Sequence, residues 1–89
     1  MNPTVIVEVP SRHTEEYDRG EKFEHYKQVP SLCEYVLIAF DERAIEVWAR
    51  GTGTEWTRTV ARAGGATRLA SIGSTLEVDA LYDSILEPT

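Results

Sequence analysis

Two short segments that are apolar on both faces, 4–9 and 34–40, most constrain the fold of this chain. The first reads Thr-Val-Ile-Val-Glu-Val, and its alternating side chains are apolar on both sides until Glu8. A strand of this kind normally lies in the interior of a sheet that is covered on both faces. Pro10 has no amide hydrogen to donate, so it should end the first strand.

The segment between these strands predicts a helix over 14–28. Thr14 is a candidate N-cap, and acidic residues in the first turn complement the positive end of the helix dipole. Gly20 is an interior flaw that costs about 1 kcal/mol relative to alanine. Pro30 closes the segment. A strand, a helix and a second strand form a βαβ unit, whose crossover is right-handed in nearly all proteins.

The remainder of the chain predicts further strands and a final helix. Residues 44–50 alternate between apolar and polar, which is typical of an antiparallel partner. The other expected elements are strands at 54–62 and 67–70 and a helix at 78–86. We therefore predict an α/β fold, a mixed β-sheet with a βαβ crossover followed by an antiparallel meander, as a single domain over 1–89.

Composition excludes several classes of protein. The net charge of −6 is unfavourable for a protein that binds nucleic acid only through non-specific phosphate contacts. Cys33 is the single cysteine, so no internal disulfide can form, and a reducing compartment is expected. The sequence has no apolar run of 18 residues and no signal peptide, which predicts no membrane association and a cytoplasmic location.

Glu8 and Lys22 are the first candidates for a functional site. Glu8 stands at the carboxyl end of a strand that otherwise reads as buried, where open α/β sheets bind ligands. The alternative is a strand end that is simply exposed to solvent. Lys22 shares a helical face with Asp18 and Tyr26, and spacing alone favours an i,i+4 ion pair with Asp18. If both faced one cleft, a carboxylate and a lysine could hold a divalent metal and stabilise charge on a phosphate.

Other chemistry-bearing residues carry no recognisable motif. His13 and His25 lack the spacing of a metal site and are expected at the surface. Cys33 has no context for a nucleophile and is expected to pack as a small hydrophobe. Trp48 and Trp56, on neighbouring predicted strands, are more typical of a packing pair than of a base-stacking platform.

The stretch "NPTVIVEVPS…TEEYDRGEKFEHYKQVPSLCEYVLIAFDERAIEVWAR" resembles a known family. It is similar to the Uma-type putative restriction endonucleases, which belong to the PD-(D/E)XK nuclease superfamily. The tail "SIGSTLEVDALYDSIL" is also similar to the closing segment of that family. The resemblance implies a restriction-endonuclease-like half-domain and Mg²⁺-dependent hydrolysis of DNA.

The resemblance also implies roles for individual residues. Glu8 matches the metal-binding acid, and the carbonyl of Val9 would lie beside the metal. The lysine that usually follows the acid by two residues is absent, because position 10 is Pro. Lys22 matches a lysine moved to the following helix. Asp18 and Arg19 match an accompanying pair with a supporting role.

The chain departs from the family at its beginning. Members of the family have an upstream strand that carries a second metal-binding aspartate, whereas Met1 stands directly before the Glu8 strand. The expectation is a truncated member of the family, with weak Mg²⁺ binding and incomplete catalytic activity. The alternative is a non-catalytic dimeric or partner-binding module. Because segment 4–9 would lack its upstream neighbour, a homodimer through this segment is expected.

Overall fold

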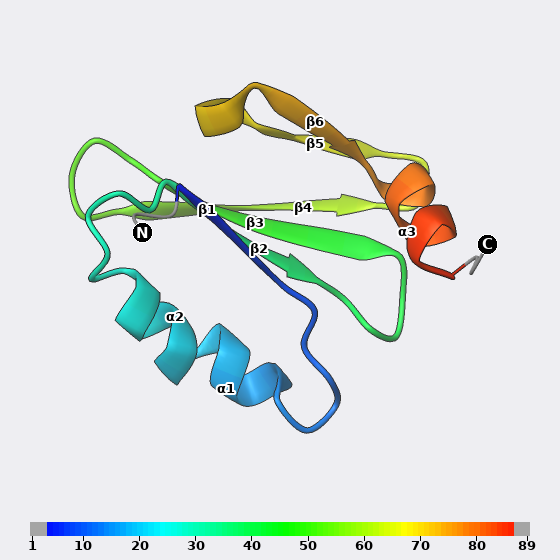
Figure 1. The fold of residues 1–89 in the computed structure, drawn as a ribbon, viewed down its shortest axis with the longest axis horizontal. Coiled ribbons are helices and arrows are strands. Elements are labelled where there is room, and N and C mark those ends of the chain that lie inside the picture. Colours follow the sequence, from blue (N-terminus) through cyan, green and yellow to red (C-terminus); the bar gives the residue numbers. More distant parts are fainter. Residues whose placement is uncertain (1–3, 87–89) are drawn as a thin grey trace.

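A four-stranded mixed sheet forms the centre of the protein (Figure 1). The computed structural model describes residues 4–86. The strands are β1 (Val5–Glu8), β2 (Glu34–Ile38), β3 (Ala44–Arg50) and β4 (Trp56–Arg62). They are ordered β1-β2-β3-β4, with β1 parallel to β2 and the remaining pairs antiparallel. The predicted α/β class, with its βαβ crossover and antiparallel meander, is therefore confirmed.

The crossover contains two helices rather than one. They are α1 (Glu15–Arg19) and α2 (Glu21–Tyr26), so the prediction of a continuous helix over 14–28 is wrong. Gly20 separates them with φ −101° and ψ −93°, outside the helical region, and thus both ends α1 and begins α2. Thr14 occupies the N-cap position, but its hydroxyl accepts a hydrogen bond from the Ser11 amide (2.9 Å) and does not cap the helix.

The opposite side of the sheet is covered by the C-terminal part of the chain (Figure 1). Strands β5 (Ala66–Leu69) and β6 (Ser74–Glu77) form a separate antiparallel pair, joined by a 3-10 turn (Ala70–Ile72). Helix α3 (Val78–Leu86) follows, as predicted. Strand β6 was not predicted, because no apolar alternation marks it. Gly73 adopts the left-handed conformation (φ 64°) that lets the chain turn back into β6.

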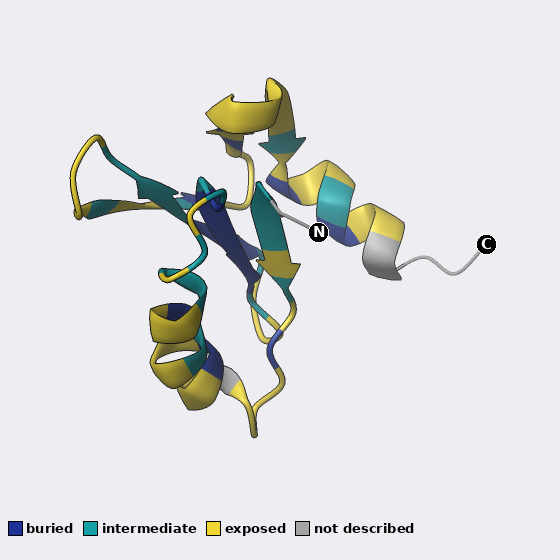
Figure 2. Cartoon of the chain, turned by 60° about the vertical axis from the view of Figure 1, so that its left-hand side comes forward, coloured by how far each residue is buried: buried dark blue, intermediate teal, exposed yellow. Residues whose placement is uncertain are grey.

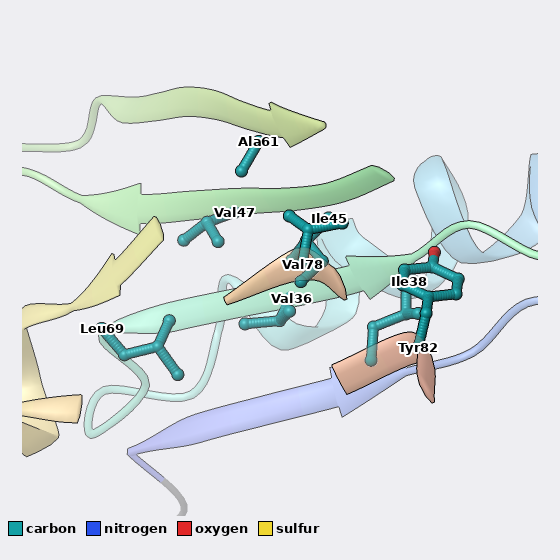
Figure 3. Close-up of a cluster of buried hydrophobic side chains, with 8 residues drawn as sticks. All are labelled: Val36, Ile38, Ile45, Val47, Ala61, Leu69, Val78 and Tyr82. Atoms are coloured by element: carbon teal, nitrogen blue, oxygen red, sulfur yellow. The ribbon is translucent and has the colours of Figure 1, made fainter. Parts of the chain in front are cut away.

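The core consists of two clusters on the two faces of the sheet. All residues of β2 are buried (Figure 2), and its alternating side chains supply both clusters. Toward the helices, Tyr35 and Leu37 pack with Phe23. Toward the C-terminal layer lies the larger cluster (Figure 3), which contains Val36, Ile38, Ile45, Val47, Ala61, Leu69, Val78 and Tyr82. The expectation of a sheet covered on both faces is confirmed for β2.

Strand β1 lies at one edge of the sheet, which agrees with the expected lack of an upstream neighbour and not with the interior position that its apolar pattern alone predicted. Ile6 packs toward the helices and Val5 toward the C-terminal layer, as the alternation requires. Val7 and Val9, however, are 50% and 60% exposed. Among residues 4–86, β2 is the only strand that pairs with β1.

The helices within residues 4–86 are too short or too polar to span a membrane.

Candidate functional site

Glu8 and Lys22 meet on the helix-covered face of the sheet. Glu8 is the last residue of β1, and Lys22 lies in the first turn of α2. The Nζ atom of Lys22 is 2.9 Å from Oε1 of Glu8, and both side chains are about three-quarters buried, with exposures of 28% and 23%. The predicted convergence of these side chains is confirmed. Their catalytic role stays a prediction.

Both alternatives for Lys22 are present together. Its Nζ atom also lies 3.4 Å from Oδ1 of Asp18, which is the i,i+4 pair that the spacing favoured. Lys22 therefore bridges two carboxylates, one from β1 and one from α1. The hydrogen bond to Glu8, reinforced by both negative charges, raises the pKa of the Lys22 ammonium against the opposing effect of desolvation. The side chain consequently stays cationic at neutral pH.

Two tyrosines complete the network. The hydroxyl of Tyr26 donates a hydrogen bond to Oε1 of Glu8 (3.1 Å). The hydroxyl of Tyr35 donates to the backbone carbonyl of Asp18 (2.9 Å). Burial, followed by the hydrogen bond to Glu8, raises the pKa of Tyr26, so this hydroxyl remains a donor at neutral pH.

The two oxygens of Glu8 have different environments. Lys22 and Tyr26 both contact Oε1. No described residue donates a hydrogen bond to Oε2. The network therefore fixes the orientation of the carboxylate through one oxygen and leaves the other for an external ligand.

The donor set at Glu8 fits only part of a magnesium site. Mg²⁺ usually binds one or two carboxylates, several waters and substrate phosphates in octahedral geometry. Glu8 could supply one carboxylate oxygen. Among the described residues, no group of three acidic, histidine or cysteine side chains could hold a metal ion. Val9, whose carbonyl was predicted to lie beside the metal, follows Glu8 directly; its role as a ligand stays a prediction.

Arg19 belongs to a neighbouring cluster that the sequence did not reveal. Its guanidinium pairs with Oε1 of Glu46, a β3 residue that is only 4% exposed. Oε2 of Glu46 accepts hydrogen bonds from Nε of Arg58 (2.9 Å) and from the indole of Trp48 (2.7 Å). Burial would raise the pKa of Glu46, but the hydrogen bonds from Arg58 and Arg19 outweigh it and hold the pKa below its ordinary value.

Strand register relates the two carboxylates. Glu8 is paired with Leu37, Leu37 with Glu46, and Glu46 with Val60. These side chains share one face of the sheet, and two strand spacings place the backbones of Glu8 and Glu46 about 10 Å apart. The only sequence signal for Glu46 was its alternation with Trp48, which placed a carboxylate on the same strand face as a large aromatic residue.

The remaining candidates lie at the surface or take part in packing. His13 and His25 are exposed. Trp48 and Trp56 each lie 5.3 Å from the ring of Phe23, measured between ring centroids, so they pack around α2. Cys33 is partly buried, and its thiol lies 3.6 Å from the carbonyl of Ser31. None of these side chains forms a hydrogen bond or ion pair with Glu8 or Lys22 in the described part of the chain.

Comparisons with known proteins agree with the resemblance found in the sequence. Residues 1–79 match the Uma2 family, which is described as "Putative restriction endonuclease". A protein of Synechocystis sp., named "Uncharacterized protein slr1290", is 35% identical over 80 residues, which are 90% of this chain and 42% of that protein. The chain thus spans less than half the length of this relative. Because this family match covers most of its residues, the chain belongs to the Uma2 family.

Proposed function

We propose that Glu8 and Lys22 form the acid–lysine half of a metal-dependent site that cleaves phosphodiester bonds in DNA. The observation that carries this proposal is the 2.9 Å contact between Lys22 Nζ and one oxygen of Glu8, with the other oxygen unengaged by described residues. Membership of a family described as "Putative restriction endonuclease" supports DNA as the substrate. Asp18 and Tyr26 serve as positioning residues.

Each side chain has a distinct task in this proposal. A lysine ammonium has three N–H donors, and Glu8 and Asp18 face two of them. The third can donate to a phosphate oxygen and stabilise the negative charge that develops there. Tyr26 and Lys22 hold Glu8 so that Oε2 can bind Mg²⁺. When bound, that ion lowers the pKa of a coordinated water and polarises the phosphate.

The proposal assigns one carboxylate to this chain. The described residues contain no group of three acidic, histidine or cysteine side chains that could hold the ion. The other ligands therefore come from water, from the substrate phosphate or from another polypeptide segment. A single carboxylate binds Mg²⁺ weakly, so the chain alone should have little activity.

The first experiment measures nicking of supercoiled plasmid with Mg²⁺ or Mn²⁺. Glu8→Ala and Lys22→Met should abolish whatever nicking the wild type shows. There are two matched controls. Glu77→Ala removes an exposed acid on β6, and Lys27→Met removes a lysine just after α2. Nicking that survives Glu8→Ala would contradict the proposed site.

A second readout does not depend on turnover. Mn²⁺ broadens NMR signals of nuclei near its binding site even when affinity is weak. We expect amide signals around Glu8 and Val9 to broaden first, and this effect to disappear in Glu8→Ala but not in Glu77→Ala. Broadening that is unchanged in Glu8→Ala would contradict the proposal even if no nicking is detected.

The exposed edge of β1 favours a second role, the pairing of two copies of the chain. A β-branched edge strand is a template for pairing with another chain, and Val7 is half exposed beside it. Two-fold contacts are the commonest solution for such a surface. We expect a homodimer by analytical ultracentrifugation at micromolar concentration.

Val7 is a better position than Ile6 for a substitution that tests this dimer. Ile6→Lys would disrupt the cluster around Phe23 as well as any interface, because Ile6 packs against that cluster. Val7→Lys changes an exposed side chain and should dissociate the dimer without unfolding the monomer. A monomeric wild type, or a Val7→Lys variant that remains dimeric through the same edge, would contradict this role.

A further inference from the structure

A pocket lies beside the candidate site on the helix-covered face of the sheet. It has a volume of about 120 Å³. Three arginines, Arg19, Arg58 and Arg62, line it together with Glu46, Asp41 and Glu42. Arg62 pairs with Glu42 (2.6 Å) at the rim of the pocket. Because Glu46 lies in the same register row as Glu8, the pocket is about two strand spacings from the candidate metal ligand.

Glu46 holds two of the arginines at this pocket. A buried carboxylate is unfavourable unless it is paired, and Glu46 pairs with both Arg19 and Arg58. If Glu46 served only to attach α1 to the sheet, its ion pair with Arg19 would be sufficient. Arg58 needs no such attachment, because its strand is already hydrogen-bonded to β3, where Arg58 is paired with Trp48. The contact instead fixes the direction of the Arg58 guanidinium.

The binding end of Arg58 is available. Its side chain is 50% exposed, and Nε donates to Glu46. Neither terminal nitrogen has a recorded partner among residues 4–86. A guanidinium fixed through Nε presents its remaining N–H groups in a planar fork, which matches two oxygens of a phosphate.

The row of arginines continues beyond this pocket. A second, more open hollow is lined by Arg12, His13, Glu16 and Arg19, so Arg19 is common to both. The guanidinium of Arg12 lies over the ring of Phe40 (5.4 Å to the centroid), and Phe40 also lines the first pocket. Arginines therefore recur from the loop after β1 to β4, with the carboxylates of Glu16, Asp41, Glu42 and Glu46 among them.

We propose that the Arg19–Arg58–Arg62 pocket binds a backbone phosphate of the DNA, next to the phosphate that Lys22 contacts. The extended form of the row of arginines suits a polyanion rather than a single small acid. This inference rests on the proposed function for the identity of the substrate. Binding in the pocket requires neither metal nor cleavage, so the two can be tested separately.

The test is binding of a short fluorescein-labelled DNA duplex, measured by fluorescence anisotropy in EDTA over a series of salt concentrations. Arg58→Ala should weaken binding by about threefold to tenfold at low salt and reduce the slope of log K against log salt by about one. Arg68→Ala is the matched control, because Arg68 is an exposed arginine on β5, outside the pocket. It should leave both quantities unchanged.

A second variant separates charge from folding. Arg58→Lys keeps the positive charge and should recover most of the salt dependence, and urea unfolding of each variant checks that it is folded. Equal losses in Arg58→Ala and Arg68→Ala would show general attraction and overturn the pocket, as would no measurable binding of DNA by the folded wild type. DNA binding that depends on Arg58 but is indifferent to Glu8→Ala, with no cleavage, would retain this inference while the proposed catalytic function fails.

Discussion

Replacing the buried Glu46 carboxylate with an amide should destabilise the protein by about 2 kcal/mol. Glu46 is 4% exposed and accepts from Arg19, Arg58 and the indole of Trp48. A hydrogen bond that involves a charged group contributes about 1.5–3 kcal/mol. Glu46→Gln removes the negative charge from all three interactions, and its single carbonyl oxygen can still accept from Arg58 and Trp48 while its NH2 group cannot accept from Arg19. Arg19 and Arg58 are 41% and 50% exposed, so water compensates part of the loss.

Urea unfolding followed by tryptophan fluorescence would measure this effect, since both tryptophans pack around Phe23. With a urea m-value of about 1 kcal/mol/M for so small a domain, the midpoint should fall by about 2 M. Glu42→Gln is the matched control, because Glu42 pairs with Arg62 at the surface and should contribute less than about 0.5 kcal/mol. A Glu46→Gln midpoint within 0.5 M of the Glu42→Gln midpoint would refute the reasoning.

The same carboxylate makes stability depend on acid. The folded state holds the pKa of Glu46 below its ordinary value of 4.5, so the unfolded state binds the proton first as pH falls. The contribution of Glu46 is therefore fully present above about pH 4.5 and is lost as the pH drops toward the lower pKa of the folded state. Wild type should lose more stability than Glu46→Gln between pH 5 and pH 3. Parallel pH curves would contradict the assignment.

Three further predictions concern other parts of the chain. Phe23→Ala should cost about 3–5 kcal/mol, because the ring fills the cluster beneath α2; the urea midpoint and near-ultraviolet circular dichroism measure this, and a loss below 1 kcal/mol would contradict it. Lys22 and Tyr35 have raised pKa values in the folded state, so the unfolded state releases protons first and stability should fall as pH rises above about 10. Lys22→Met should weaken that alkaline dependence in melting curves, and an unchanged dependence would disprove the role of Lys22. Calorimetric titration of the chain with Mg²⁺ should show weak or undetectable binding; micromolar stoichiometric binding that Glu8→Ala abolishes would show that the site is already complete.

Local pattern in the sequence determined most of the sheet. Strand 44–50 and helix 78–86 have the predicted bounds, because alternation and helical periodicity record which face of each element is buried. The parallel pairing of β1 with β2 followed from the helical segment between them, since parallel strands require a crossover. Gly20 was visible as a flaw, but its consequence, two helices in place of one, depended on how the crossover fits the sheet.

Part of the candidate site could likewise be predicted from the sequence, and part could not. Glu8 and Lys22 were found from a strand end, a helical face and a family resemblance, and all three are local or linear signals. The Glu46 cluster joins residues that are 27 and 12 positions apart and come from α1, β3 and β4. No spacing rule links them, because their contact arises from strand register and from the packing of α1 onto the sheet. For β1 the apolar pattern indicated an interior strand and the family resemblance a bare edge. Only the tertiary structure decided for the edge, since strand order is a property of the folded sheet whereas burial pattern is a property of each strand.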